Sequence, residues 1–213
     1  MPRHDAALPQ HGFARTALFE WIDSHETDHA TSLTFRLKSS QKYRELFPYA
    51  FELTYSVIVA EELRLELTTY NGDEATFLLT QALHSYFAVS DISKIHVSGL
   101  EGCRYIDYVN AQRQERQQGT VKIVQEVDRV YEEVTSPVEL YDGVRCISVT
   151  NEGSRSVVVW NPWREKCARM RAMEPTSYRT MLCIESANAG NDVRHIDPGE
   201  SHTLTAVIRS TLL

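Results

Sequence analysis

The sequence has 213 residues, of which 42% are hydrophobic and 24% are charged, and its formal net charge is −7 at pH 7. A chain of this size and composition can bury a sizeable core, and we predict a single domain over residues 1–213. The negative charge argues against a general nucleic-acid or anionic-membrane surface, because both need a clustered positive face. A phosphorylated small molecule remains compatible, since it needs only one or two local arginines.

The cellular compartment is indicated by two features of the sequence. No apolar run approaches the roughly 18 residues of a membrane-spanning helix, and the polar start MPRHDAALPQ lacks the apolar region of a signal peptide. The cysteines have neither the short spacing of a metal site nor the density of a disulfide scaffold. We therefore expect a cytoplasmic protein with free thiols at Cys103, Cys146, Cys167 and Cys183.

The first thirty residues contain a motif that resembles a metal site. Residues 1–10 carry two prolines and no periodic pattern, which predicts a loop or arm, and residues 11–21 predict a turn followed by a strand. Residues 25–29 read HETDH, which matches the zinc pattern H-E-x-x-H. That motif works only on a helix, whereas a strand-like segment follows here. A polar hairpin turn is therefore the better interpretation.

The following stretch shows clear alternation of apolar and polar residues. Residues 39–47 predict a short helix, with serines at its start and Pro48 beyond its end. Residues 51–59 and 63–67 alternate with a period of two, and Asn71-Gly72 is a turn signal. We predict two neighbouring antiparallel strands here.

The rest of the chain contains many short apolar segments separated by turns. The polar segment 112–119 lacks an apolar stripe and predicts a solvated loop, residues 163–171 predict a helix, and residues 188–200 predict a loop. Further strands are expected at residues 94–98, 105–109, 121–124, 138–141, 145–150, 157–160, 180–186 and 204–209. Together these elements predict an all-β protein, an antiparallel β-sandwich with one or two short helices.

The stretch from residue 78 to residue 100 centres on His84. Apolar and β-prone residues precede this histidine, and the aromatic residues Tyr86 and Phe87 follow it. An imidazole near a strand end against an apolar wall can be poised near neutrality as a proton donor or acceptor. The alternative is a hydrogen-bonded structural histidine, which is common for a lone histidine in a strand.

Seven short motifs occur in an order that matches a known family. They are HGFAR at 11–15, ALHSYFAVSDI at 82–92, SGLEG at 98–102, DRVY at 128–131, WNPW at 160–163, MLCIES at 181–186 and PGESH at 198–202. In this the sequence resembles the hexose-6-phosphate mutarotases, also called glucose-6-phosphate 1-epimerases, of the aldose 1-epimerase superfamily. The resemblance covers nearly the whole chain and implies the galactose-mutarotase-like β-sandwich.

The resemblance also implies a chemistry and a set of site residues. Interconversion of sugar anomers needs one general acid and one general base, and neither a metal nor a redox cofactor. The family's acid histidine matches His84, and its base glutamate matches Glu185. Its substrate-holding acid matches Asp128, and the arginine of HGFAR, Arg15, resembles its phosphate contact. The implied activity is mutarotation of a hexose 6-phosphate, with glucose 6-phosphate expected first.

Each of these residues also has a structural interpretation. Glu185 could face outward from a strand, Asp128 could cap a turn, and Arg15 could pair with a surface carboxylate. We expect Trp160 and Trp163 to serve packing rather than sugar stacking.

The sequence also departs from the family pattern. Only ten residues precede HGFAR, where family members carry early strands and a glycine-rich stretch. Exposed sheet edges would favour pairing with another chain, so a homodimer is expected. Residues 171–174 and Tyr108 differ from the family and affect the expected substrate choice. The alternative function is a catalytically impaired sugar-phosphate-binding or interaction protein on the same fold.

Overall fold

The computed structural model of the protein describes residues 9–213, so the loop expected at residues 1–10 lies largely outside the described residues. The chain divides into two compact units, which we describe separately. The first unit comprises the residues up to 79 together with 194–203, and the second comprises 80–193 together with 204–213. The single domain expected over residues 1–213 stays a prediction.

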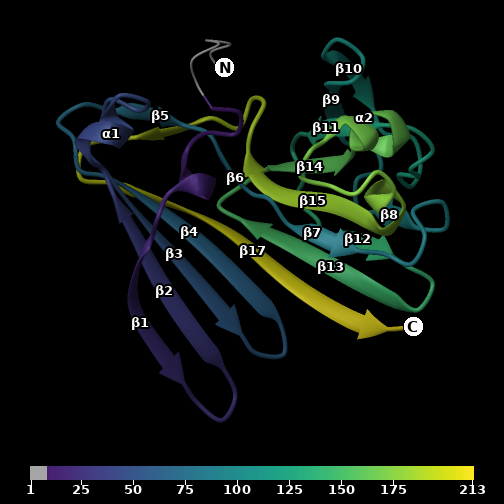
Figure 1. Ribbon diagram of the computed structural model, residues 1–213, viewed down its shortest axis with the longest axis horizontal. Coiled ribbons are helices and arrows are strands. Elements are labelled where there is room, and N and C mark those ends of the chain that lie inside the picture. The colour runs from purple at the N-terminus through teal and green to yellow at the C-terminus, as the bar shows by residue number, and fades with distance from the viewer. Residues whose placement is uncertain (1–8) are drawn as a thin grey trace. The chain divides into compact units, whose positions relative to one another are not determined.

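The first unit is built on an antiparallel meander of four consecutive strands (Figure 1). The strands are β1 (Glu20–Glu26), β2 (Thr31–Lys38), β3 (Phe51–Val59) and β4 (Leu63–Asn71). A separate pair joins β5 (Phe77–Leu79) to β16 (Arg194–Ile196). Two short helical segments complete the unit, the 3-10 helix η1 (Ala14–Thr16) and α1 (Gln41–Arg44).

The alternating segments fold as the sequence predicts. β3 and β4 pair in the antiparallel sense from Phe51 opposite Asn71 to Val59 opposite Leu63. The expected helix at residues 39–47 is confirmed as the shorter α1, and its Tyr43 ring stacks on Phe13 at 5.0 Å. HETDH forms the end of β1 and the turn into β2, where the Thr27 amide donates to the Ala30 carbonyl. The hairpin interpretation is therefore confirmed.

The second unit contains two antiparallel sheets that enclose one core (Figure 1). One sheet has the order β10-β9-β11-β14-β15-β6, with β7 also paired to β15. Its strands are β6 (Gln81–Leu83), β7 (Tyr86–Ala88), β9 (Arg104–Asp107), β10 (Arg113–Arg116), β11 (Val127–Tyr131), β14 (Ser156–Asn161) and β15 (Met181–Asn188). The other sheet has the order β17-β13-β12-β8. Its strands are β8 (His96–Ser98), β12 (Val138–Tyr141), β13 (Arg145–Glu152) and β17 (Ser201–Leu212).

The core of the second unit lies between these two sheets. Val157 and Leu182 from the first sheet share one buried cluster with Val138, Leu140 and Ile147 from the second. Two packed antiparallel sheets with their apolar faces together define a β-sandwich. The helices are short: α2 (Trp163–Arg169) and the 3-10 helix η2 (Ser177–Thr180). The predicted fold class is therefore confirmed.

Four local predictions need correction. The strand expected to end at Trp21 begins only at Glu20, because η1 and three residues outside any helix or strand precede it. The predicted loop 112–119 contains the edge strand β10, whose mostly exposed side chains need no apolar stripe. Residues 121–124 alternate in burial but form only one bridge, Val121 to Val97, so their pattern reports burial rather than a ladder. The predicted loop 188–200 contains β16.

Over residues 9–213, none of the helices has the length and apolar character required to cross a membrane. The four cysteines are free, as the sequence predicts.

Candidate functional site

The site-bearing face of the large sheet follows from its strand register. Successive residues of a strand point to opposite faces, so Val157 and Ile184 enter the core while Val158 and Glu185 point the other way. Two rows of facing residues result. One joins Asp128, Trp160, Cys183 and Tyr86 across β11, β14, β15 and β7, and the other joins Val130, Val158 and Glu185.

His84 completes the second row. It lies in the two-residue break between β6 and β7, where β15 changes its partner from Leu83 to Tyr86. Its Nε2 atom lies 3.1 Å from Oε1 of Glu185, and the two side chains are 27% and 7% exposed. The structure therefore brings the predicted acid and the predicted base into direct contact, with the histidine on the solvent side.

The carboxyl group of Glu185 is unusually well buried. All eight residues of β15 are buried, so the side chain has lost most of its contact with water. Burial raises the pKa of Glu185 to about 8, and the negative charge of Asp128 adds to the effect. A carboxyl with such a pKa can accept and release a proton near neutrality, as general acid–base catalysis requires.

Aromatic rings form the wall around this pair. The Tyr86 ring stacks on His84 at 4.7 Å, and Trp160 meets His84 edge-on at 6.1 Å. Trp160 is buried and packs against Met181 and Cys183, which agrees with its expected packing role. An open pocket of about 540 Å³ begins at Tyr86, and it is lined by Tyr86, Arg171, Ala172, Met173, Glu174 and Ser177. The pocket therefore shares Tyr86 with the aromatic wall around the His84–Glu185 pair.

Asp128 lies on the same face and has a cationic neighbour. Its Oδ2 atom is 3.7 Å from Nζ of Lys166, which in turn is 2.7 Å from Oε1 of Glu126. The backbone carbonyl of Asp128 accepts a hydrogen bond of 2.8 Å from the Tyr108 amide. Asp128 is therefore part of a strand and of a charged cluster.

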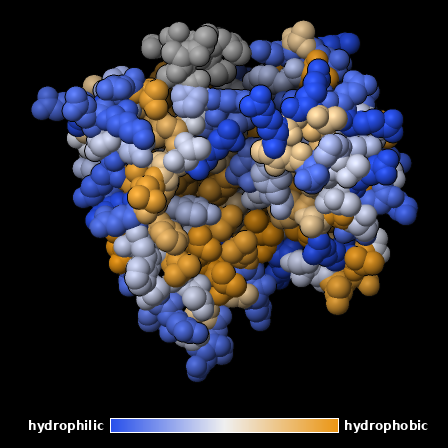
Figure 2. Space-filling model, viewed as in Figure 1, coloured by the Kyte–Doolittle hydropathy of each residue, from blue (hydrophilic) through white to orange (hydrophobic). Residues whose placement is uncertain are grey.

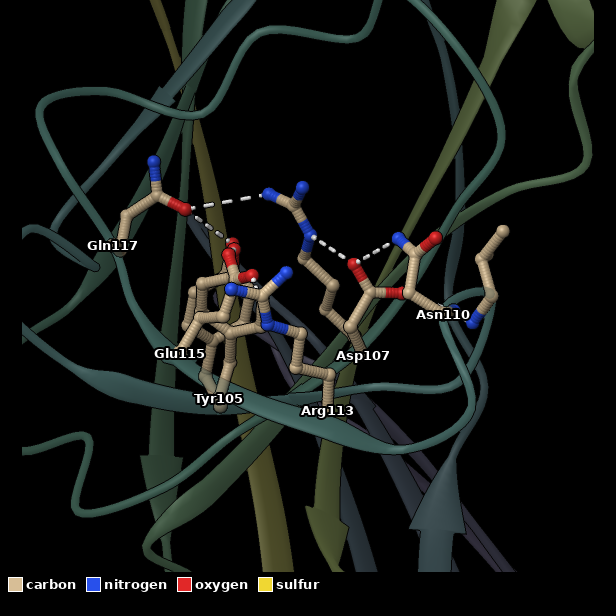
Figure 3. Close-up of polar contacts among 9 residues, drawn as sticks. Tyr105, Asp107, Asn110, Arg113, Glu115 and Gln117 are labelled. Atoms are coloured by element: carbon tan, nitrogen blue, oxygen red, sulfur yellow. Dashed lines mark hydrogen bonds and ion pairs between the residues drawn. The ribbon is translucent and has the colours of Figure 1, made fainter.

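The opposite face of β11 is anchored by a polar network (Figure 3). Arg129 lies 3.7 Å from the Asp107 carboxylate, donates to Gln117 at 3.4 Å, and stacks 4.5 Å above the Tyr105 ring. Gln117 also accepts a hydrogen bond of 2.8 Å from the Tyr131 hydroxyl. Since Arg129 follows Asp128 directly, this network fixes the strand that carries Asp128.

Arg15 belongs to the first unit. It lies at the centre of η1 and is exposed. Its phosphate role stays a prediction. Reasoning from the sequence missed Lys166, because it belongs to no periodic pattern and becomes notable only through its tertiary neighbour Asp128. Residues 171–174, noted above for their departure from the family, line the pocket.

His84, Cys183 and Glu185 form a cluster whose residue types could ligate a metal. Their donor atoms lie up to 4.8 Å apart, which is wide for ligands that would each approach zinc to about 2.0–2.3 Å. The arrangement fits proton transfer better than metal binding.

The described residues thus place a histidine–glutamate pair on one face of a two-sheet β-sandwich. The family model described as aldose 1-epimerase matches residues 1–209. The chain therefore belongs to the aldose 1-epimerase family.

Individual relatives agree with this assignment. A candidate glucose-6-phosphate 1-epimerase of Salmonella typhimurium is 36% identical over 191 residues, and one of Cenchrus ciliaris is 32% identical over 206 residues. These alignments cover 88% and 91% of the chain but 63% and 62% of the relatives. The crystal structure of a candidate mutarotase, YeaD of Salmonella typhimurium, superposes with a TM-score of 0.91 at 31% identity, covering 100% of this chain and 71% of that one. The chain thus spans somewhat less than two thirds of the curated relatives' length.

Proposed function

We propose that the protein is an aldose 1-epimerase that interconverts the α and β anomers of a hexose 6-phosphate, with glucose 6-phosphate as the first candidate. The observation that carries the proposal is the contact of 3.1 Å between His84 and the buried Glu185. The substrate class is supported by the names of the curated relatives, which are candidate glucose-6-phosphate 1-epimerases.

The reaction requires two coordinated proton transfers. Glu185 accepts the proton of the C1 hydroxyl while His84 donates a proton to the ring oxygen, so the bond between C1 and the ring oxygen breaks and an aldehyde forms. Rotation about the C1–C2 bond exposes the other face of the aldehyde. The reverse transfers then close the ring and return both protons. In the competent form of the pair, the histidine is therefore protonated and cationic, and the glutamate is ionised.

The remaining residues of the face have supporting roles in this reaction. Asp128 accepts hydrogen bonds from sugar hydroxyls, and Tyr86 and Trp160 limit access of water to the acid–base pair. Proton transfer of this kind needs no metal or redox cofactor.

Magnetisation-exchange NMR on the two anomeric protons of glucose 6-phosphate tests the activity. We expect exchange between the anomers to be faster with the protein than in buffer, in the presence of a chelator. Exchange at the buffer rate, with folded protein that still binds the sugar phosphate, would contradict the enzyme and support the alternative of a sugar-phosphate-binding protein.

The role of Arg15 gives a separate prediction. Arg15→Ala should raise KM for glucose 6-phosphate by about tenfold or more and leave the value for glucose nearly unchanged, because a charge-assisted contact acts only when the phosphate is present. Steady-state kinetics with both sugars measure the ratio. Arg155→Ala, an exposed arginine of the second unit, serves as the control for a change in net charge. An equal loss for both sugars would assign Arg15 a structural role.

Two further expectations also remain proposals. A cytoplasmic location is supported by the four free cysteines. Pairing with a second copy of the chain is supported by the edge strand β1, whose seven residues are all exposed and include Trp21 at 64%. Figure 2 shows further apolar surface, drawn in orange. Sedimentation velocity measures this self-association, and Trp21→Lys should weaken it.

A further inference from the structure

The ammonium group of Lys166 reaches the carboxylate that the proposed function assigns to substrate binding. Its Nζ atom lies 3.7 Å from Oδ2 of Asp128, 2.7 Å from Oε1 of Glu126, and 6.0 Å from the centre of the Trp160 ring. The side chains of Lys166, Glu126 and Asp128 are 37%, 28% and 32% exposed. These charges are partly withdrawn from water, so their mutual interaction is stronger than that of an open surface pair.

A strained turn fixes the helix that carries Lys166. Trp163, the first residue of α2, has a φ of 56°, which is unfavourable for an aromatic residue. Asn161 offsets this cost: its Oδ1 atom accepts the Trp163 amide at 2.8 Å, and its Nδ2 atom donates to the carbonyls of Tyr178 and Met181 at 2.9 Å each. Asn161 is completely buried, so the turn has little freedom. The direction of α2 is therefore built into the fold, and with it the place of Lys166.

We propose that Lys166 is a positioning residue of this site, which holds the Asp128 carboxylate in place and offsets its negative charge. Its effect on catalysis rests on the proposed function. Its effect on the charges of the site does not, because that effect follows from the contacts themselves.

The electrostatic consequence can be followed from residue to residue. Asp128 helps to raise the pKa of Glu185, so a cation beside Asp128 weakens that effect. Removal of the cation should therefore raise the pKa of Glu185 further. Among the described residues, the titratable groups that face Glu185 include His84 and Cys183, and those near Asp128 include Glu126, Lys166 and Tyr108.

Carboxyl NMR tests this consequence without any substrate. Protein with carbon-13 in the glutamate carboxyls is titrated as wild type, Lys166→Met and Lys166→Arg, and Glu185→Gln assigns the resonance. We expect an upward shift of the Glu185 pKa in Lys166→Met and a return toward the wild-type value in Lys166→Arg. The matched control is Lys94→Met, since Lys94 is 76% exposed and pairs with Asp91 at 3.4 Å on the surface. It should leave Glu185 unchanged.

Kinetics test the positioning role. With Asp128 no longer held, KM for glucose 6-phosphate should rise about tenfold in Lys166→Met, with a smaller change in kcat, and Lys166→Arg should restore most of the affinity. Should Lys166→Met fail to fold, Lys166→Gln is measured in its place.

The outcomes of these experiments separate the role of Lys166 from the proposed function. A wild-type protein without epimerase activity would contradict the proposed function, while an altered Glu185 titration in Lys166→Met would still support the charge-offsetting role. An unchanged Glu185 titration together with an unchanged KM would overturn the inference. The same holds if Lys166→Met and Lys94→Met have equal effects, because Lys166 would then act only through the net charge.

Discussion

His84→Asn and Glu185→Gln are each expected to slow anomer exchange by about a hundredfold or more. General acid and general base catalysis typically contribute factors of about 10² to 10⁴ each. Glu185→Gln keeps the size of the side chain, His84→Asn shortens it, and both remove the group that exchanges the proton. Magnetisation-exchange NMR under saturating glucose 6-phosphate measures the rate. A variant that keeps nearly the wild-type rate would show that the other residue, or a group elsewhere, transfers the proton.

The pH dependence of the wild type provides a second test of the pair. The competent form holds one proton, so the rate should fall when a second proton binds at low pH and when the shared proton is lost at high pH. The profile is therefore expected to be bell-shaped, with apparent pKa values that belong to the pair. A rate that rises to a plateau would indicate that only one of the two groups titrates in the reaction.

Stability measurements control for misfolding of Glu185→Gln. Folding raises the pKa of Glu185 from about 4.5 to about 8, so the folded state binds more protons than the unfolded state between these pH values. The stabilising contribution of the protonated carboxyl is complete below pH 4.5 and is lost as the pH rises through 8. Glu185→Gln stays neutral, so it should equal the wild type in acid and exceed it above pH 8, by about 2 kcal/mol or more. Urea unfolding at both pH values measures the difference.

Gly99→Ala is expected to destabilise the second unit strongly, although it adds only one methyl group. A Cβ atom at this position would lie 2.2 Å from the carbonyl oxygen of Pro137, and Gly99 has a φ of +87°. The approach is close because Ser98 at the end of β8 pairs with Glu139 of β12. The obstacle is backbone, so neither strand can yield without loss of its ladder. We expect the free energy of unfolding to fall by about 4 kcal/mol or more, measured by urea denaturation.

Gly102→Ala is the matched control for Gly99→Ala. Gly102 belongs to the same SGLEG motif and has a similar φ of +78°, but apart from its chain neighbours no atom lies within 4 Å of the position that an added methyl carbon would take. Its replacement should cost only the conformational strain, about 1 to 2 kcal/mol. Equal losses for the two variants would mean that backbone conformation, and not the contact with Pro137, explains the requirement for glycine at position 99.

The sequence by itself determined the fold class and most of the strands. Period-two alternation located β3 and β4, because apolar residues line one face of each strand and mainly polar residues line the other. Alternation failed to predict strands where burial of side chains and pairing of backbones do not coincide. β10 is paired but exposed, and residues 121–123 have two buried side chains with only one bridge. A local pattern records the burial of side chains, whereas a ladder also needs a partner strand.

For the candidate site too, the sequence determined one part and the tertiary structure another. The order of short motifs was enough to name His84, Glu185 and Asp128, yet it could not show that they share one face. That depends on the register of β11, β14 and β15 and on the break between β6 and β7, which are set by packing between distant segments. Lys166 was not predictable at all, because its importance comes from one strained residue that directs its helix toward Asp128. The sequence specifies the residue types and their order. The distances between these groups, their burial and the resulting pKa values depend on the tertiary structure that brings them together.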